Sequence, residues 1–166
     1  MKPPAISLEE ILQLGEPLLR IPIPEAYSDS NGHMNVRWYV GIFDDASDVL
    51  HDDLGLTVDY HARNGTGTFD LEHHIQYLSE AMPGERAAVY VRYLAGGAKR
   101  LHYIMFLVNE TQARLSATLE CINAFADLRV RRTAPWPEEA VTKITQRVRD
   151  GKRLAWAAPV CGVMGV

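Results

Sequence analysis

The sequence predicts an α+β domain in which an antiparallel sheet of about five strands wraps around one long helix, with a short helix toward each end. Two observations predict this class. One stretch of about twenty residues carries apolar side chains at helical spacing, and four strand-like segments separated by turn signals follow it. A sheet of that size with one apolar face has to bury the face, and the long helix can cover it.

Two short elements are predicted before the long helix. Ser7 with Glu10 forms a capping-box pattern, which predicts a helix over residues 7–14 that ends at Gly15. Prolines alternate with isoleucines between residues 19 and 27. Because proline cannot donate to a strand ladder, this segment is predicted to be an edge strand or an irregular one.

The long helix is predicted over residues 35–54, with Gly55 able to end it. The Asn64-Gly65 pair then predicts a loop over residues 60–67. A strand follows over residues 69–77, where alternation predicts two sides. One side carries Phe69, Leu71, His73, Ile75 and Tyr77, and the other carries Asp70, Glu72, His74 and Gln76.

Three further strands and a last helix complete the predicted order. The strands cover residues 87–94, 100–109 and 115–129, and the helix covers residues 138–149. An apolar tail over residues 154–166 should pack on the same subunit or on a neighbour. We therefore expect one domain over residues 1–166, with a core at about residues 19–130 and the helix and tail at 136–166.

Composition and charge exclude several classes of partner. The net charge is -4, and the Lys and Arg residues are scattered, so we expect neither nucleic acid nor a membrane as partner. No apolar stretch reaches the ~20 residues that span a bilayer. Residues 1–4 lack the apolar core of a secretory signal, which favours a cytoplasmic protein. Cys121 and Cys161 lack metal-ligand spacing and are predicted to be buried or incidental thiols.

The segment Asp29-Ser30-Asn31-Gly32-His33-Met34-Asn35 is the most informative part of the chain. It places an acid, a flexible turn and a histidine directly before the long helix. A carboxylate beside the positive end of a helix dipole is suited to cleaving an acyl bond. The same residue types are also common in turns and helix caps, so the segment alone leaves a structural role open.

This segment, the helix behind it and Pro83-Gly84-Glu85 resemble the hotdog-fold acyl-CoA thioesterases of the 4-hydroxybenzoyl-CoA thioesterase type, over roughly residues 21–127. The order of elements agrees as well. The resemblance implies a hotdog fold, subunits paired through their sheets and active sites at the subunit interface. The catalytic acid of that family lies three residues before the glycine, a position that Asp29 occupies here.

Within that family the chain more closely resembles the betainyl-CoA thioesterases of bacterial carnitine breakdown. The matching segments are Gly32-His33-Met34, Phe43-Asp44-Asp45-Ala46-Ser47-Asp48, Glu72 with His74-Ile75, and Lys99-Arg100-Leu101-His102. Ser30 and Asn35 depart from the pattern. The resemblance implies hydrolysis of a small acyl-CoA thioester, with betainyl-CoA as a candidate and with no cofactor, because coenzyme A is part of the substrate.

The predicted catalytic residues are Asp29, His33, Asn35 and Val36. Asp29 could attack the thioester carbonyl or deprotonate a water molecule, and the sequence leaves both open. The backbone amides around Asn35, Val36 and Arg37 could stabilise the oxyanion. His33 could orient substrate or fix the turn, and Asn35 is the expected N-cap.

The predicted substrate-binding residues are Trp38, Asp45, Asp48, Glu72 and His74. Asp45 and Asp48 could recognise a cationic acyl group with help from Trp38, Tyr39, Tyr60 or Tyr77, or they could form a solvated helix face. Glu72 and His74 share one side of a strand and could line the cavity or simply lie on its surface.

His73 should face the other side of that strand from His74, so we expect no metal site, and His51 and His61 are expected at the surface. Candidates for binding the phosphates of coenzyme A are Arg37, Lys99 and Arg100, together with Arg63.

Two other functions are alternatives for this sequence. A non-catalytic acyl-CoA-binding hotdog protein would keep the fold without the reaction. An enoyl-CoA hydratase of a related fold would need aspartate and histidine five residues apart within Asp-x-Asn-Pro-x-His, whereas here Asp29 and His33 are four apart and Gly32 replaces the proline. Because a single subunit would leave long sheet edges open, at least a homodimer is expected.

Overall fold

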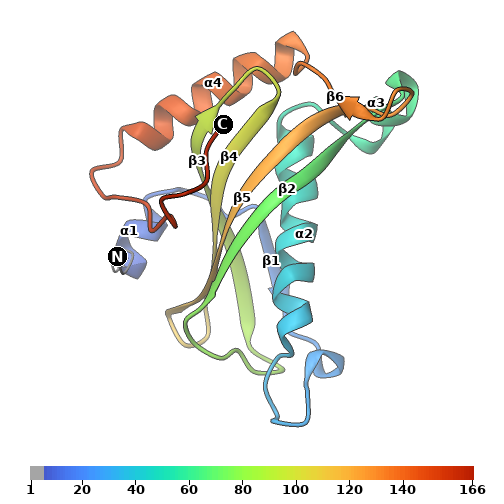
Figure 1. The fold of residues 1–166 in the computed structure, drawn as a ribbon. Coiled ribbons are helices and arrows are strands. Elements are labelled where there is room, and N and C mark those ends of the chain that lie inside the picture. Colours follow the sequence, from blue (N-terminus) through green and yellow to red (C-terminus); the bar gives the residue numbers. More distant parts are fainter. Residues whose placement is uncertain (1–5) are drawn as a thin grey trace.

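The computed structural model describes residues 6–166, and its main feature is a curled antiparallel sheet beside one long helix (Figure 1). The first half of the chain contains α1 (Leu8–Leu12), β1 (Leu19–Pro22), the 3-10 turn η1 (Glu25–Tyr27), α2 (Val36–Asp53) and α3 (Val58–Asn64). The rest contains β2 (Thr66–Tyr77), β3 (Arg86–Gly96), β4 (Arg100–Asn109), β5 (Arg114–Asp127), β6 (Arg132–Thr133) and α4 (Glu138–Lys152). The predicted fold class is confirmed.

The strands lie in the order β1-β3-β4-β5-β2, and all pairs are antiparallel. The short strand β6 pairs only with the end of β5. The helix α2 lies on one side of the sheet, whereas α1 and the C-terminal tail lie on the other (Figure 1). We call the side that faces α2 the inner face and the opposite side the outer face.

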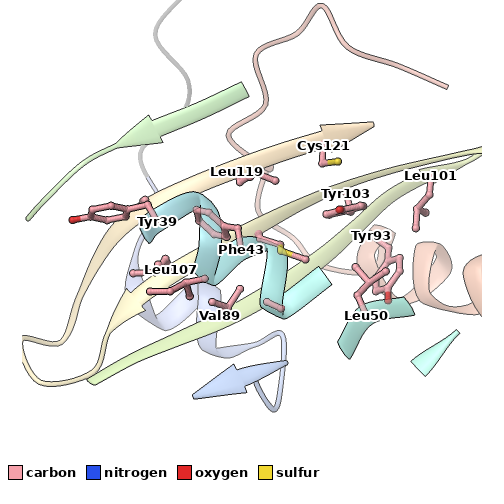
Figure 2. Packing of buried hydrophobic residues seen from close by; sticks show 14 of the residues in the cluster. Tyr39, Phe43, Leu50, Val89, Tyr93, Leu101, Tyr103, Leu107, Leu119 and Cys121 are labelled. Carbon is pink, nitrogen blue, oxygen red and sulfur yellow. The ribbon is translucent and has the colours of Figure 1, made fainter. Parts of the chain in front are cut away.

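The inner face and α2 enclose the main core. Tyr39, Phe43 and Leu50 of α2 are buried with Val89 and Leu107 of the sheet (Figure 2). These helix positions are four and seven residues apart, close to one and two helical turns, which is the spacing that predicted the helix. Because each fully buried side chain of this size contributes about 1.5–3 kcal/mol, packing holds α2 against the sheet.

A second apolar cluster covers the outer face. Ile11 of α1 packs with Tyr90, Phe106 and Trp156, and the Phe106 and Trp156 rings meet edge to face at 5.9 Å. The predicted capping box of α1 is present, since Ser7 and Glu10 bond reciprocally. The apolar tail therefore packs on its own subunit, which was one of the two predicted places for it.

The predicted loop over residues 60–67 is wrong, because α3 spans most of it. The Thr57 side chain caps this helix by accepting the N–H of Tyr60 at 3.1 Å. Gly65 ends it with a φ of 62°, a left-handed conformation that favours glycine. The Asn64-Gly65 pair was thus correctly recognised as a turn signal, but it marks the end of a helix and not the middle of a loop.

Three predicted boundaries also moved. The first strand ends at Pro22, and η1 occupies residues assigned to its second half. The last long strand ends at Asp127, and α4 continues through Gly151 to Lys152. Gly151 can stay inside the helix because it packs directly on the carbonyl of Tyr93, where a larger residue has no room.

The predicted sides of β2 are wrong before residue 72, because a bulge shifts the register between Asp70 and Glu72. An extra residue in one strand turns the following side chains to the other face. Asp70 and His73 therefore lie on the same face and hydrogen-bond at 2.8 Å. The alternation holds again afterwards, with His73 opposite Cys121 and His74 opposite Glu120.

His51 was expected at the surface and is instead buried on α2, where burial lowers its pKa. His61 is half-buried, and its Nδ1 lies 3.0 Å from the Thr66 hydroxyl. Among residues 6–166, none of the helices has the length and apolar character to cross a bilayer. Residues 1–4, used above for the cytoplasmic expectation, lie outside the described residues, and that expectation stays a prediction.

Candidate functional site

The loop that carries Asp29 is a small closed hairpin before α2. Ser28 and Met34 form an isolated antiparallel bridge, and the N–H of Asp29 donates to the carbonyl of His33 at 3.0 Å. Gly32 turns the chain with a φ of 82°, and its N–H returns to the carbonyl of Asp29. The N–H of Met34 donates to Ala81 at 2.8 Å, which ties the loop to the end of the sheet.

One oxygen of the Asp29 carboxylate accepts a hydrogen bond, and the other accepts none from the described residues and is available to a substrate. Oδ1 accepts the N–H of Asn31 at 2.7 Å, which orients the group. Oδ2 lies 3.7 Å from Nδ1 of His33. The Asp29 side chain is 18% exposed, so a substrate can reach it while the loop still positions it.

The first turn of α2 leaves one backbone amide free near this carboxylate. The N–H of Asn35 donates to Tyr27, and the N–H of Arg37 is capped by Oδ1 of Asn35 at 3.1 Å. The N–H of Trp38 donates back to Asn35. Within the described chain, the N–H of Val36 has no partner, which makes it the donor available to an oxyanion at the positive end of the helix.

Asp29 and Val36 line the same open cavity of about 500 Å³. Its walls come from the hairpin, the start of α2 and the segment after β2. The lining residues are Asp29, His33, Met34, Asn35, Val36, Tyr39, Tyr77, Leu78, Ser79 and Glu80. All four predicted catalytic residues are therefore brought together around one cavity.

His33 is placed to contact both the acid and the loop. Besides its approach to Asp29, its Nδ1 lies 3.3 Å from the carbonyl of Met34. One ring nitrogen therefore faces the hairpin itself. This arrangement can fix the turn and can also orient a substrate, so both predicted roles stay open.

The aromatic side chains that line the cavity do not include Trp38, which was predicted to bind substrate. Tyr39 and Tyr77 line it and meet edge to face at 5.3 Å. Trp38 instead stacks on Tyr27 at 3.9 Å and does not line this cavity. Arg37 lies over the Trp38 ring at 4.8 Å, on that same side.

The acidic positions of α2 are exposed within one subunit. Asp45 and Asp48 are exposed and do not line the cavity of Asp29. Burial raises the pKa of the neighbouring Asp44, and the negative charges of Asp48 and Asp70 add to the rise. This face of α2 therefore carries concentrated negative charge.

Four predicted residues lie away from Asp29 in a single subunit. Glu72 and His74 lie on the outer face, since they pair with Ile122 and Glu120, whose side chains alternate with the buried inner residues Cys121 and Leu119. Lys99 and Arg100 lie at the turn between β3 and β4, where Lys99 contacts Thr133 at 3.3 Å. The 11 residues of β3 separate this turn from the Asp29 end by roughly 30 Å.

A polar cluster on the inner face was not predicted. Asp70 accepts hydrogen bonds from His73 at 2.8 Å and Asn123 at 2.6 Å, and the Cys121 thiol lies 3.4 Å away. Burial raises the pKa of Asp70, but the bonds from His73 and Asn123 outweigh it and the net shift is downward. Periodicity alone could not reveal the cluster, because the bulge that assembles it has no clear sequence signal.

The chain matches the model of the Thioesterase-like superfamily over residues 25–144. It is 30% identical to a betainyl-CoA thioesterase of Pseudomonas aeruginosa, over 87% of this chain and 91% of that protein. It is 33% identical to an L-carnitine dehydrogenase/betainyl-CoA thioesterase of Ruegeria pomeroyi, over 83% of this chain and 28% of that protein.

The chain spans about a quarter of the length of that two-activity protein and of three similar ones. Among solved structures, a hypothetical protein of Staphylococcus aureus in complex with CoA superposes with a TM-score of 0.80. Its sequence is 24% identical, over 89% of this chain and 93% of that one, so the match shows a shared fold and no more. The extent of the family match and the relative of similar length together show that this chain belongs to the Thioesterase-like superfamily.

Proposed function

We propose that this protein hydrolyses a small acyl-CoA thioester to the free acid and CoA, with Asp29 as the catalytic carboxylate. One observation carries the proposal: Asp29, with one carboxylate oxygen available, and Val36, with a free N–H, line the same cavity. An acid or nucleophile beside an oxyanion donor is the combination that acyl transfer needs. The thioesterase relatives of the chain support the same reaction.

The reaction has two routes that use the same residues. In the first, Asp29 attacks the carbonyl, the C–S bond breaks, CoA leaves as a thiolate, and water hydrolyses the mixed anhydride. In the second, Asp29 takes a proton from water as the water attacks the carbonyl; the C–S bond then breaks, and CoA leaves as a thiolate that takes up the proton. In both, the N–H of Val36 stabilises the negative oxygen, and the helix dipole of α2 adds to this. No cofactor is needed beyond the CoA that the substrate carries.

A single turnover in ¹⁸O-labelled water tests for the first route. If Asp29 attacks and water then opens the anhydride at the carbonyl of Asp29, the first molecule of product keeps one unlabelled enzyme oxygen and the label enters Asp29. Activated water instead labels the first product and leaves Asp29 unlabelled, as does attack of water on the acyl carbonyl of the anhydride. Later turnovers would carry label in both cases. Mass spectrometry of the product acid and of the peptide that contains Asp29 gives the answer.

We propose betainyl-CoA as the substrate, with Asp45 and Asp48 recognising its quaternary ammonium group. The betainyl-CoA thioesterases that the chain resembles support this choice. The negative charge on the exposed face of α2 is suited to a cation, and Tyr39 and Tyr77 supply aromatic surface in the cavity of Asp29. Because Asp45 and Asp48 do not line that cavity within one subunit, this recognition requires the α2 face of a second subunit. This assignment would place the protein in carnitine breakdown.

The assay measures thiol release from betainyl-CoA, a short neutral acyl-CoA and an aromatic acyl-CoA. We expect the highest kcat/KM with betainyl-CoA, and Asp45→Asn and Asp48→Asn should each lower it at least tenfold more than for the neutral thioester. The same substitution at Asp59, an exposed acid on α3, is the control. Equal losses on both substrates would contradict cation recognition, and binding without turnover would favour a non-catalytic acyl-CoA-binding protein.

We also propose a homodimer in which two β2 edges pair. Among the described residues, β2 pairs only with β5, so its other edge is unpaired. Phe69 and Leu71 of β2 are 64% and 40% exposed. An unpaired edge of this length is prone to pair with another chain. Antiparallel pairing would bring the turn with Lys99 and Arg100 of the second subunit toward the Asp29 end of the first, where these cations could bind the phosphates of CoA.

Complementation tests this shared site. Asp29→Asn and Arg100→Ala homodimers should each be weakly active, but a co-expressed hybrid should regain activity because one of its two sites is intact. Light scattering should report a dimer in every case. Hybrids that form but regain no activity would show that Arg100 and Asp29 act within the same subunit.

A further inference from the structure

A second group of polar side chains lies on the outer face of the sheet, away from the cavity of Asp29. It consists of Glu120 on β5, His74 on β2, His102 on β4 and Cys161 in the C-terminal tail. The residues come from three neighbouring strands and from a segment 41 residues after Glu120, so only the folded structure brings them together. The thioester reaction proposed above uses none of these contacts.

Glu120 is the centre of this group and is almost fully buried, with 1% of its surface exposed. Its Oε1 accepts Nε2–H of His102 at 2.8 Å. Its Oε2 accepts the backbone N–H of Cys161 at 2.6 Å. A buried carboxylate requires such partners, and each of its oxygens retains a further lone pair that can bind a cation.

Two potential metal ligands face that carboxylate without a hydrogen bond of their own. Nδ1 of His74 lies 4.0 Å from Oε2 of Glu120, beyond hydrogen-bond distance. Among residues 6–166, neither the ring of His74 nor the thiol of Cys161 has a hydrogen-bond partner. The nitrogen, sulfur and carboxylate ligand atoms of His74, Cys161 and Glu120 all lie within 4.8 Å of one another.

These distances suit one small cation. A tetrahedral zinc ion with bonds of about 2.0–2.3 Å holds its nitrogen, oxygen and sulfur ligands about 3.3–3.8 Å apart. The three side chains would therefore need to close by less than about 1.5 Å, which rotamer adjustments and a small shift of the tail can supply. One thiolate, one carboxylate and a divalent ion together are neutral, which lowers the cost of enclosing them.

We propose that His74, Glu120 and Cys161 bind a Zn²⁺ ion that fastens the C-terminal tail to the outer face of the sheet. The Cys161 thiol releases its proton to solvent on binding, and the metal forms bonds to sulfur, nitrogen and one oxygen of Glu120. A fourth position stays open to water. His102 does not bind the ion but holds Glu120 in place, as hydrogen-bonded partners of metal ligands do.

Packing at Trp156 already holds the C-terminal tail close to Glu120. Trp156 packs in the outer cluster, its carbonyl accepts Nη1–H of Arg92 at 2.8 Å, and the Arg92 guanidinium lies 4.2 Å from its ring centre. Only four residues separate Trp156 from Cys161. The anchor at Trp156 thus limits how far Cys161 can move and makes metal binding less costly in entropy.

Sequence spacing could not indicate this site. His73 and His74 do point to opposite faces, so the two histidines cannot grip one ion, as expected from their alternation. The third ligand, however, comes from the far end of the chain. The inner group of Asp70, His73 and Cys121 also has metal-binding side chains, but all of these already meet in hydrogen bonds with Asp70.

The test uses the full-length protein freed of metal by a chelator. Zn²⁺ titration against a chromogenic chelator should show one tight site per chain, and Co²⁺ should give the visible and near-ultraviolet bands of a tetrahedral thiolate complex. Cys161→Ser and His74→Ala should each weaken binding at least tenfold. Cys121→Ser and His73→Ala are matched controls from the inner face and should leave the titration unchanged.

A second measurement follows the tail directly. Zn²⁺ should slow amide hydrogen exchange and proteolysis in residues 157–166 of the wild-type protein, and it should not do so in Cys161→Ser. Absence of binding in the wild type, or binding that Cys161→Ser leaves intact, would overturn the proposal. Loss of binding in the two inner-face controls alone would assign the ion to the Asp70 group and overturn it as well.

Discussion

The side chain of Asn35 accepts the backbone N–H of Arg37 at 3.1 Å and thereby closes the first turn of α2. The N–H of Val36, one position earlier, remains without a partner among the described residues. A helix begins with several free N–H groups, and capping normally satisfies some of them. Here the cap selects which amide stays available beside Asp29.

Replacement of Asp29 by Asn should lower kcat for thioester hydrolysis by about a hundredfold or more, because a positioned acid–base group contributes ~10²–10⁴. The variant should fold normally, since its side-chain oxygen can still accept the N–H of Asn31. Steady-state thiol release and circular dichroism check both statements. Turnover near the wild-type value would remove Asp29 from the reaction.

Two substitutions at Asn35 should separate stability from catalysis. Asn35→Ala removes the cap and should lower the free energy of unfolding by ~1 kcal/mol. Asn35→Asp keeps a capping oxygen but adds negative charge beside the Val36 N–H, so it should preserve stability and lower kcat. Urea unfolding and thiol release measure the two effects. If Asn35→Asp hydrolyses the thioester as fast as the wild type, the amide of Val36 does not hold the oxyanion.

The Asp70–His73 pair should make stability depend on pH. The hydrogen bond to Asp70 raises the pKa of His73, so its contribution is full below the unfolded value of about 6.5 and is lost as pH rises through the folded value. The lowered pKa of Asp70 gives a contribution that is present above about 3.9 and is lost as pH falls further. The pair therefore stabilises the fold between these limits.

Comparison with His73→Gln over a series of pH values tests this dependence. The free energy of unfolding of the wild type should exceed that of the variant near pH 5.5 by no more than about 1 kcal/mol, because the pair is partly exposed. The difference should shrink as pH rises above about 6.5. A difference that stays constant with pH would show that protonation of His73 is not involved.

Gly151 should tolerate no side chain, although it lies inside α4. A Cβ there would overlap the carbonyl oxygen of Tyr93. Gly151→Ala should lower the free energy of unfolding by about 1–3 kcal/mol, because overpacking outweighs the better helix propensity of alanine. Gly41→Ala in α2 is the matched control, since its Cβ would meet only Trp38 at 3.7 Å and should raise stability by about 0.5–1 kcal/mol. Thermal unfolding of both variants measures the contrast.

Local patterns in the sequence determined a large part of this protein. The spacing of Tyr39, Phe43 and Leu50 predicted α2, and Ser7 and Glu10 predicted the cap of α1. The segment from Asp29 to Asn35 predicted candidate catalytic residues that line one cavity. These features depend on residues a few positions apart, whose physical preferences act along the chain itself. The resemblance to hotdog thioesterases added the wrapping of the sheet around α2.

Tertiary structure decided what depends on distant residues. The bulge in β2 joined Asp70 to His73, and packing buried His51. The tail brought Cys161 to Glu120 across 41 positions of sequence. It also placed Glu72 and His74 on the outer face, and Lys99 and Arg100 far from Asp29 in one subunit. Strand register and the path of a tail result from the packing of the whole core, so no short stretch of residues encodes them.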